Sequence, residues 1–294
     1  MKILIVSLIK KNNQPVESLI AAGQSKKHQI DHCSYRDLKL IFDNQNGFQI
    51  LVPDLPLSTY DCLILRRPVN LTHISHLLAI YAKKHNIYLL NQDSIIDYPL
   101  FDKAIQYALL AEQSIPIIPA TLDTVENDFR YISQNFGLPF IYKCINGTCG
   151  LTVYKINSSS DLENLPKYQK RAKHRLYLAQ KYWPIDYDLR IITLGKKVLG
   201  GMKRISTNPQ EFRTNYSLGN QVENYSVPPE IADLALSASS AVKCEHAGID
   251  ILFHQGQPYI IEINRYCYFD GFKKATSIDV AAEIIDYLQQ KIQK

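Results

Sequence analysis

The chain has 294 residues, of which 46% are hydrophobic and 21% are charged. These proportions are typical of a folded globular protein and exclude disordered, collagen-like and repetitive chains. The length exceeds what one compact core usually serves, so we expect two or three packed subdomains. The net charge of +5 suits an anionic ligand without specifying one.

The amino-terminal segment predicts a buried strand and not a targeting signal. Its apolar run at residues 3–9 ends at Lys10 and Lys11, and no small-residue cleavage site follows. No uncharged apolar run approaches the roughly 18 residues of a membrane span, so we expect no membrane partner. The six cysteines are scattered and form no Cys-x-x-Cys pair, which favours reduced thiols and a cytoplasmic location.

The first hundred residues alternate short apolar runs with polar helical stretches. We expect buried strands at residues 3–8, 49–52, 62–65 and 87–90, and a helix at 74–84. This alternation predicts a small α/β amino-terminal domain over residues 1–98.

A helix is predicted next, at residues 101–113, with Ile105, Leu109 and Leu110 on one face. Three β-like runs follow, at 139–143, 151–156 and 176–182. We expect residues 99–182 to form a second, small subdomain.

The last part of the chain, residues 183–294, predicts a third subdomain. Runs at 190–194 and 198–203 flank Gly195-Lys196-Lys197, a hairpin signal, and helices are expected at 230–246 and 279–292. The fold class is therefore a mixed α/β protein with antiparallel hairpins.

Two β-rich runs, 248–253 and 259–264, surround a five-residue loop and predict a further hairpin. If Phe253 pairs with Tyr259, Asp250 lies opposite Glu262, and the two-residue period of a strand places Asn264 on the same face.

Like charges that face each other between apolar strands are destabilising. A bound cation would reverse that effect, and three oxygen donors suit Mg²⁺. The alternative is that the two acids are separately solvated or paired with lysines. Because they lie inside strongly apolar strands, we favour a metal site.

A glycine-containing loop follows the strand that ends at Lys143. Gly147 and Gly150 permit backbone conformations in which amide hydrogens converge on an anion, and the lysine beside them would neutralise phosphate charge. Arg204, Arg213 and Asn215 are further candidate ligands for phosphate or carboxylate. Taken singly, each of these residues is more often an ordinary surface residue.

Other nucleotide and nucleic-acid signatures are missing. The sequence has no Gly-x-x-x-x-Gly-Lys-Ser/Thr loop and no Gly-x-Gly-x-x-Gly turn. A basic run at residues 167–175 lacks interleaved aromatic residues, so a solvated surface is the better interpretation and no nucleic-acid partner is expected.

Seen together, these segments resemble the ATP-grasp superfamily and, within it, the RimK-like branch of glutamate ligases. The resemblance covers roughly residues 88–290 and is strongest over 139–264. The matching segments are Leu90-Asn91-Gln92, Asp102-Lys103, Tyr142-Lys143, Gly147-Thr148-x-Gly150, Ala179-Gln180-Lys181-Tyr182, Asp188-Leu189-Arg190, Glu211-Phe212-Arg213-Thr214-Asn215, Ala247-Gly248-Ile249-Asp250-Ile251-Leu252 and Glu262-Ile263-Asn264.

The resemblance implies an ATP-grasp fold, in which a small amino-terminal α/β domain precedes two subdomains that enclose the nucleotide. It implies ATP and Mg²⁺ as cofactors, with Mn²⁺ as an alternative metal, and the metal ligands Asp250, Glu262 and Asn264. It assigns ATP binding to Lys103, Lys143, Gly147, Thr148, Gly150, Gln180, Lys181, Tyr182, Asp188, Arg213 and Asn215, and catalytic stabilisation to Arg213, Arg204 and Arg190.

The sequence departs from the family pattern at three places. Lys181 stands where the adenine-contacting hinge usually has a glutamate, and Thr152 stands where the phosphate loop usually has another glycine. The family's Ala-Ser-Pro-Gly turn after the metal strand is replaced by the aromatic loop 265–272. Residues 1–87 resemble the family only in length and layout.

The implied function is an ATP-dependent carboxylate–amine ligase that forms an amide through an acyl phosphate. Its partners would be a carboxylate substrate and an amine substrate, for example glutamate joined to a peptide, a protein or a small amine. Two alternatives stay open, a non-catalytic ATP-binding module and a ligase for peptides in place of free amino acids. A homo-oligomer is compatible with the sequence.

Overall fold

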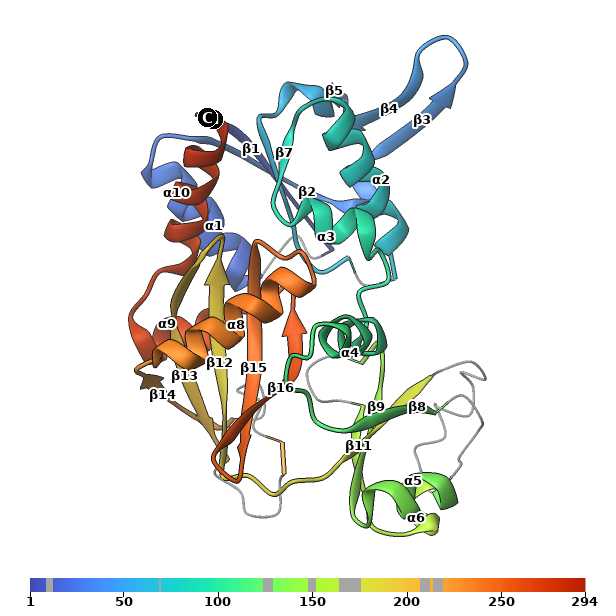
Figure 1. The fold of residues 1–294 in the computed structure, drawn as a ribbon. Helices are drawn as coiled ribbons and strands as arrows, with labels where there is room; N and C mark the ends of the chain where they lie inside the picture. Colours follow the sequence, from blue (N-terminus) through green and yellow to red (C-terminus); the bar gives the residue numbers. More distant parts are fainter. Residues whose placement is uncertain are drawn as a thin grey trace.

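The computed structural model describes residues 1–8, 13–68, 70–123, 129–147, 152–163, 176–206, 212–213 and 219–293. Its strands form four sheets, two of four strands, one of five and one of three. Figure 1 shows the amino-terminal sheet at one end of the molecule and the two larger carboxyl-terminal sheets side by side at the other. The predicted mixed α/β class is confirmed.

The amino-terminal sheet is parallel and has the order β2-β1-β6-β7. Its strands are β1 (Lys2–Ser7), β2 (Gln29–Ser34), β6 (Cys62–Leu65) and β7 (Tyr88–Leu89), and its helices are α1 (Gln14–Ser25), α2 (Thr72–Lys84) and α3 (Gln92–Asp97). Strands at 3–8 and 62–65 and the helix at 74–84 are thereby confirmed, whereas α1 and β2 have no predicted counterpart.

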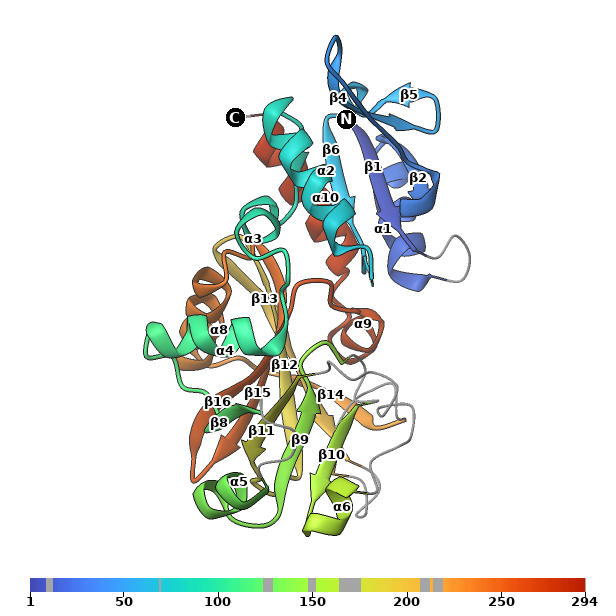
Figure 2. The same ribbon diagram turned by 90° about the vertical axis from the view of Figure 1, so that its right-hand side faces the viewer.

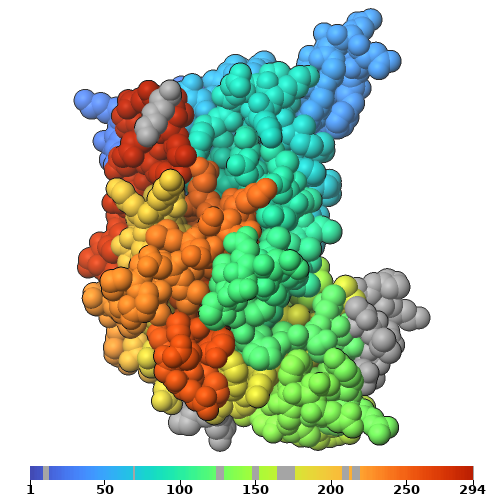
Figure 3. Space-filling view, viewed as in Figure 1, coloured from blue at the N-terminus to red at the C-terminus, as the bar shows by residue number. Residues whose placement is uncertain are grey.

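A separate antiparallel sheet stands beside it. Its strands are β3 (Lys39–Asp43), β4 (Gly47–Val52) and β5 (Leu55–Pro56), with the short 3-10 helices Tyr35–Asp37 and Leu57–Thr59 on either side. The run 49–52 is a strand, as expected, but it belongs to this hairpin and not to the parallel sheet. The β3–β4 hairpin projects from the body of the molecule (Figures 1 and 3), and its Phe42 side chain is 65% exposed.

The small subdomain is an antiparallel sheet of order β10-β9-β11-β8. Its elements are β8 (Ala120–Asp123), α5 (Phe129–Phe136), β9 (Phe140–Cys144), β10 (Val153–Ile156), α6 (Ser159–Glu163) and β11 (Tyr177–Lys181). All three predicted β-like runs form strands of this sheet. Helix α4 (Lys103–Glu112) precedes it and packs on the next sheet, against α8 and β16.

The carboxyl-terminal sheet is antiparallel and has the order β14-β13-β12-β15-β16. Its elements are β12 (Tyr187–Leu194), β13 (Lys197–Ile205), β14 (Gln221–Tyr225), α8 (Pro229–Ala241), β15 (His246–His254), β16 (Gln257–Asn264), α9 (Asp270–Thr276) and α10 (Val280–Ile292). The hairpin at Gly195 is confirmed. The prediction of a helix reaching residue 246 is wrong, because Lys243 adopts a positive φ of 55° and turns the chain into β15.

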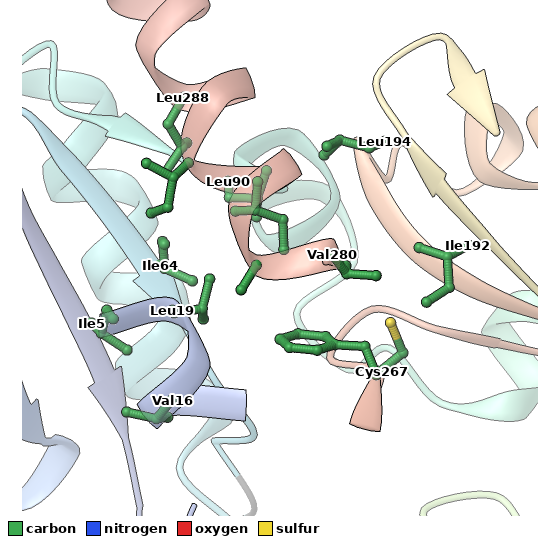
Figure 4. Close-up of a cluster of buried hydrophobic side chains, with 14 of the residues drawn as sticks. Ile5, Val16, Leu19, Ile64, Leu90, Ile192, Leu194, Cys267, Val280 and Leu288 are labelled. Atoms are coloured by element: carbon green, nitrogen blue, oxygen red, sulfur yellow. The ribbon is translucent and has the colours of Figure 1, made fainter. Parts of the chain in front are cut away.

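One large hydrophobic cluster joins the two ends of the chain. In Figure 4, Ile5 and Ile64 of the amino-terminal sheet lie on one side of the cluster, with Val280 and Leu288 of α10 between them and Ile192 of the carboxyl-terminal sheet. Helix α10 packs along α1 (Figure 2). The predicted segment boundaries at 98 and 182 stay a prediction, but α10 covers the sheet built from residues 2–89.

Two further observations bear on the sequence expectations. The described cysteines are all free and buried, and Cys144 packs in the hydrophobic core of the small sheet, which fits its interpretation as a packing residue. Within the described ranges, no helix is long and apolar enough to cross a membrane.

Candidate active site

The predicted acidic hairpin is present as β15 and β16, with a register that differs at the turn. Asp250 lies opposite Glu262, as expected, but Phe253 lies opposite Pro258 and not Tyr259. The turn has two residues, Gln255 and Gly256, both with positive φ. A β-bulge between Asp250 and Ile251 takes up the one-residue difference, so the acidic pair is correct although the assumed turn is wrong.

The extra residue of this bulge, Ile261, attaches the hairpin to the neighbouring elements. Its carbonyl accepts a hydrogen bond from the Tyr107 hydroxyl of α4 at 3.3 Å and from Lys143 Nζ of β9 at 3.4 Å. Gln106, also on α4, accepts a bond from the Ile263 amide at 2.8 Å. The bulge therefore holds the acidic strand at the junction of the two carboxyl-terminal sheets.

Asp250 is buried and held by two arginines. Arg190 of β12 donates to both carboxylate oxygens, with Nη2 at 2.8 Å from Oδ2, and Arg204 of β13 lies 3.2 Å from Oδ2. Burial alone would raise the pKa of Asp250, but the two guanidinium groups outweigh it and the pKa is lowered. The Asp250 carboxylate therefore carries its negative charge before any ligand binds.

A second carboxylate completes this buried network. Asp188 accepts two hydrogen bonds from Arg204, each at 2.6 Å, in the bidentate geometry that favours Arg–carboxylate pairs. Arg190, Arg204 and Asp188 were predicted as catalytic or nucleotide-binding residues. The structure places them together and shows the arginines as counter-ions of the two aspartates.

Glu262 is the more open of the two acids in the hairpin. Its side chain is 28% exposed and its one ion pair among the described residues is with Lys103, at 3.4 Å. The Asn264 amide lies 3.4 Å from Asp250 Oδ2, which confirms that the three predicted metal ligands share a face. The premise that their repulsion needs an external cation is wrong, because Arg190, Arg204 and Lys103 already supply positive charge.

The donor set nevertheless fits Mg²⁺. Glu262 and the Asn264 amide oxygen present hard oxygen donors at an open edge, and Asp250 stays ionised beside them. Among the described residues, no group of three or more His, Cys, Asp or Glu side chains is arranged to hold a metal. The candidate metal site thus depends on two carboxylates and one amide, and its role stays a prediction.

The two predicted phosphate-binding lysines are both buried and lie near each other. Lys143 is 3% exposed and its ammonium group lies 5.1 Å from the centre of the Tyr107 ring. Burial, with help from the charge of Lys103, lowers the pKa of Lys143 to about 7. A neutral or weakly charged lysine at this position is poised to become fully charged when an anion arrives.

Lys103 opens helix α4 and reaches the phosphate loop. Asp102 caps the helix by accepting bonds from the amides of Ala104 and Ile105. Lys103 Nζ donates to the Gly147 carbonyl at 2.8 Å. Gly147 is needed there, because an added Cβ would lie 1.9 Å from the Thr152 hydroxyl oxygen.

The predicted adenine hinge is the end of β11. Gln180 is buried and donates to the Tyr107 hydroxyl, whereas Lys181 is exposed and its amide donates to the Pro119 carbonyl at 2.9 Å. Lys155 lies 4.2 Å from the centre of the Tyr182 ring. The hinge therefore faces the same junction as Lys143, and its contact with adenine stays a prediction.

Some predicted residues cannot be placed in this arrangement. Thr148, Gly150 and Asn215 lie outside the described residues. Arg213 lies between two undescribed ranges, and its carbonyl accepts a bond from Asn220 at 2.9 Å. Its predicted contact with a transferred phosphoryl group is untested.

Sequence reasoning missed the polar face of α4. The buried residues of this helix are Lys103, Gln106, Tyr107 and Leu110, so the expectation of an apolar face containing Ile105 is wrong, and Ile105 is 37% exposed. The helical spacing of the buried set, at positions i, i+3, i+4 and i+7, was the available signal. It was overlooked because three of its four members are polar or amphipathic.

The assembled site carries an excess of positive charge. Lys103, Lys143, Arg190 and Arg204 surround three carboxylates, those of Asp188, Asp250 and Glu262, which gives four cations to three anions when Lys143 is protonated. Such a cluster suits a polyanion accompanied by a divalent cation.

Comparison with known families identifies the fold. Residues 101–288 match the model of the RimK-like ATP-grasp domain. The chain belongs to the RimK-like ATP-grasp family. The matched range contains every residue of the candidate site, and the family resemblance seen in the sequence is confirmed.

Named relatives of this RimK-like protein are ligases. A "Probable alpha-L-glutamate ligase" of Legionella pneumophila (strain Corby) is 26% identical over 239 residues, which are 80% of this chain and 78% of the relative. The glutamate–LysW ligase ArgX of Sulfurisphaera tokodaii is 26% identical over 300 residues, covering 99% of both chains.

Solved structures support the ATP-grasp fold along the whole chain. The ATP-grasp ligase PsnB, in complex with a precursor variant, Mg and ADP, superimposes with a TM-score of 0.76 at 16% identity, covering 99% of this chain and 98% of PsnB. The D-cycloserine synthetase DcsG gives a TM-score of 0.73 at 14% identity, covering 99% and 100%. The predicted ATP-grasp architecture is confirmed, including residues 1–87, where the sequence showed only a likeness of layout.

Proposed function

We propose that this RimK-like protein is an ATP- and Mg²⁺-dependent carboxylate–amine ligase that adds an amino acid, such as glutamate, to a peptide, a protein or a small amine. The observation that carries the proposal is the convergence of Lys103, Lys143 and the Glu262–Asn264 strand at the junction of two sheets. The names of the relatives support glutamate as one of the two substrates.

The nucleotide would lie along this junction. Lys103 and Lys143 would hold its phosphates. The Lys103 ammonium group lies at the Gly147 carbonyl, and the Lys143 ammonium group lies at the Ile261 carbonyl. Asp250, Glu262 and Asn264 would hold Mg²⁺, or Mn²⁺ in its place, which neutralises phosphate charge when bound. The backbone of the hinge at 180–182 would contact the adenine.

The reaction would proceed in two balanced steps. A carboxylate oxygen of the first substrate attacks the γ-phosphorus of ATP and gives an acyl phosphate and ADP. The neutral amine of the second substrate then attacks the acyl carbon, and phosphate leaves as the amide forms and the amine loses a proton. No nucleophilic side chain of the protein is required, so positioning and charge stabilisation carry the catalysis.

The arginine–aspartate network would keep this machinery rigid. Arg190 and Arg204 fix Asp250 from two neighbouring strands, and Asp188 fixes Arg204 from the far side. Side chains held in this way do not need to reorganise when the charge distribution changes during phosphoryl transfer.

The decisive experiment incubates the purified protein with ATP, Mg²⁺ and a panel of amino acids and peptides. Mass spectrometry would read the product, and a coupled assay would read ADP. ADP release that requires both an amine and a carboxylate, with a product heavier by one amide-linked unit, supports the proposal. Tight ATP binding without turnover over the whole panel would favour the non-catalytic module.

A further inference from the structure

The three-stranded sheet β3-β4-β5 has one protected edge and one open edge. The strand at the protected edge, β5, has two residues, and one of them is Pro56, which has no amide hydrogen to offer to a further strand. The strand at the other edge, β3, pairs all five of its residues with β4 in a regular register. Within the described part of the chain, no strand pairs with the outer side of β3. The β3 edge therefore presents backbone donors and acceptors along its whole length.

The middle of β3 is apolar, which is unusual for an open edge. Leu40 is partly buried and packs against the core of the amino-terminal domain, but the side chain of Ile41 is 38% exposed and that of Phe42 is 65% exposed. Proteins usually protect open edges with charged residues, prolines or bulges, because an apolar edge attracts other strands. Three apolar residues in succession on an open edge predict a partner strand.

The exposed Phe42 ring is held in place from the inside of the domain. It stacks on Phe48 of β4, with 4.8 Å between the ring centres and 3° between the ring planes. Phe48 in turn meets the buried Tyr81 of α2 edge-on, at 5.6 Å. A side chain that is already ordered loses little conformational entropy when a partner covers it, so this edge is prepared for association.

The two ends of β3 carry opposite charges. At one end, Lys39 forms an ion pair with Asp54 at 2.6 Å, and both side chains are more than half exposed, so this pair contributes little to stability. At the other end, the amides of Asn46 and Gln45 donate to Asp43 and lower the pKa of its carboxyl group, which keeps Asp43 ionised. The strand thus has one cation and one anion, placed symmetrically about Ile41.

This arrangement makes β3 complementary to a second copy of itself. Antiparallel pairing about a two-fold axis at Ile41 uses all five residues of both strands, whereas any shift leaves some of them unpaired. In this register Ile41 lies opposite its own copy, and Leu40 lies opposite Phe42. Lys39 of each copy lies opposite Asp43 of the other, which gives two favourable cross-strand charge pairs.

We propose that two copies of this chain associate through their β3 strands and join their three-stranded sheets into one continuous antiparallel sheet. The hairpin projects from the end of the molecule that is remote from the two carboxyl-terminal sheets (Figure 1), so the candidate active site of each copy stays away from the contact. The inference goes beyond the proposed ligase function and does not depend on it. A contact of five residues per strand is small, so we expect a dissociable dimer with a Kd on the order of 10 μM.

An extended peptide of another protein is the competing occupant of the same edge. It would use the same backbone groups and the same apolar side chains. It would not require the charges at the two ends of β3 to match each other. The relation between Lys39 and Asp43 therefore separates self-association from peptide binding.

The test measures the mass of the whole protein by sedimentation equilibrium from about 1 to about 100 μM, a range that brackets a weak dimer. The variants reverse one charge each, Lys39→Glu and Asp43→Lys, and are measured separately and as an equal mixture. Lys84→Glu, at an exposed position on α2, is the matched control for charge reversal. Hydrogen exchange at low and high concentration locates the contact.

Each sample has its own expected result. Each single variant places like charges opposite each other twice, so the dimer should weaken at least about 10-fold. In the mixture, the two reversed charges face each other with opposite sign, and so do the two unaltered ones, so dimers should form again. Lys84→Glu should associate as the unmodified protein does. In the unmodified protein, amides within 39–43 should exchange more slowly at high concentration.

Three outcomes would overturn the proposal. One is an unmodified protein that stays monomeric over the whole range, which would leave the edge to another partner. Another is a dimer that neither single variant weakens, because its contact would then lie elsewhere. The third is weakening in both variants without recovery in the mixture, which would indicate damage to the hairpin. Assays of ATP-dependent amide formation report on the ligase separately, since none of these outcomes requires turnover.

Discussion

The two polar clusters of this protein differ in how their charges are balanced. Around Asp250, each carboxylate of the hairpin has an opposite charge beside it, from Arg190 and Arg204 on neighbouring strands or from Lys103 of helix α4. Around Arg66, the buried cation is bonded to the backbone carbonyls of Tyr266 and Cys267, and among the described residues no carboxylate forms an ion pair with it.

The difference separates a network of paired charges from a buried cation that is bonded to backbone carbonyls. A network with its charges paired is stable without ligands and keeps its geometry during turnover. A buried arginine that is bonded to backbone carbonyls and not to a carboxylate keeps a charge without a counter-ion beside it. The surroundings of Asp250 are of the first kind, and the surroundings of Arg66 are of the second.

The largest expected effect comes from replacing Glu262, the partly exposed carboxylate of the cluster around Asp250. Glu262→Gln should lower turnover by at least about 1,000-fold, because charge stabilisation by a bound divalent ion amounts to several kcal/mol. The free energy of unfolding should change little, since Glu262 is partly exposed. Steady-state ADP release measures the first and urea unfolding the second. Glu223→Gln, on the exposed strand β14, is the control, and normal turnover in Glu262→Gln would contradict the metal assignment.

The buried acid of the same cluster should behave differently. Asp250→Asn leaves Arg190 without a carboxylate and should lower the free energy of unfolding by about 3–5 kcal/mol, the usual cost of breaking a buried ion pair. Urea unfolding of this variant beside Glu262→Gln gives the contrast directly. Equal stabilities would show that the network is not a structural unit.

The acid stability of the protein probes the neighbourhood of Arg66. His246 is buried there, and burial, together with the charge of Arg66, lowers the pKa of His246 to about 4. Between pH 6.5 and 4 the unfolded chain binds a proton that the folded chain does not, so stability should fall as the pH falls through this window, by on the order of 3 kcal/mol.

The measurement is urea unfolding at several pH values. His246→Gln should flatten the loss between pH 6.5 and 4, whereas His73→Gln, at an exposed position, should leave it unchanged. A slope that His246→Gln does not alter would show that other groups govern acid stability.

The smallest expected effect concerns Lys143. Its pKa of about 7 in the free protein should rise when the phosphates of ATP arrive, because an adjacent anion favours the charged form. Binding at pH 8 should therefore take up as much as about one proton. Calorimetry in two buffers of different ionisation enthalpy measures this uptake. Lys143→Arg should abolish it, and an unchanged uptake in that variant would place the proton elsewhere.

The sequence predicted the nucleotide end well because its signals are local. Alternating apolar residues and two acidic residues reveal the β15–β16 hairpin. The predicted pairing of Asp250 with Glu262 is correct although the turn was predicted wrongly, because a bulge at Ile261 takes up the one-residue difference. Bulges depend on tertiary contacts, here with Tyr107 and Lys143, and so have no reliable local signature.

The amino-terminal domain and the surroundings of Arg66 were largely not predicted from the sequence. Helix α1 has an apolar set of Val16, Leu19 and Ile20, but its signal is short and interrupted by polar residues. The cluster around Arg66 joins residues from four separate parts of the chain, and only the fold brings Tyr35, Ser75 and Tyr266 together. The aromatic loop at 265–272 was noticed as a departure, yet its partners could not be named.

The position of α10 has a consequence for how the protein is made. The first sheet to leave the ribosome has one face covered by α1 and by a helix that ends at residue 292. Until that last helix emerges, Ile5 and Ile64 lack part of their cover, and a nascent chain presents an unfinished apolar face to chaperones. Fragments that end before residue 280 should therefore aggregate, because they lack the helix α10 that covers Ile5 and Ile64.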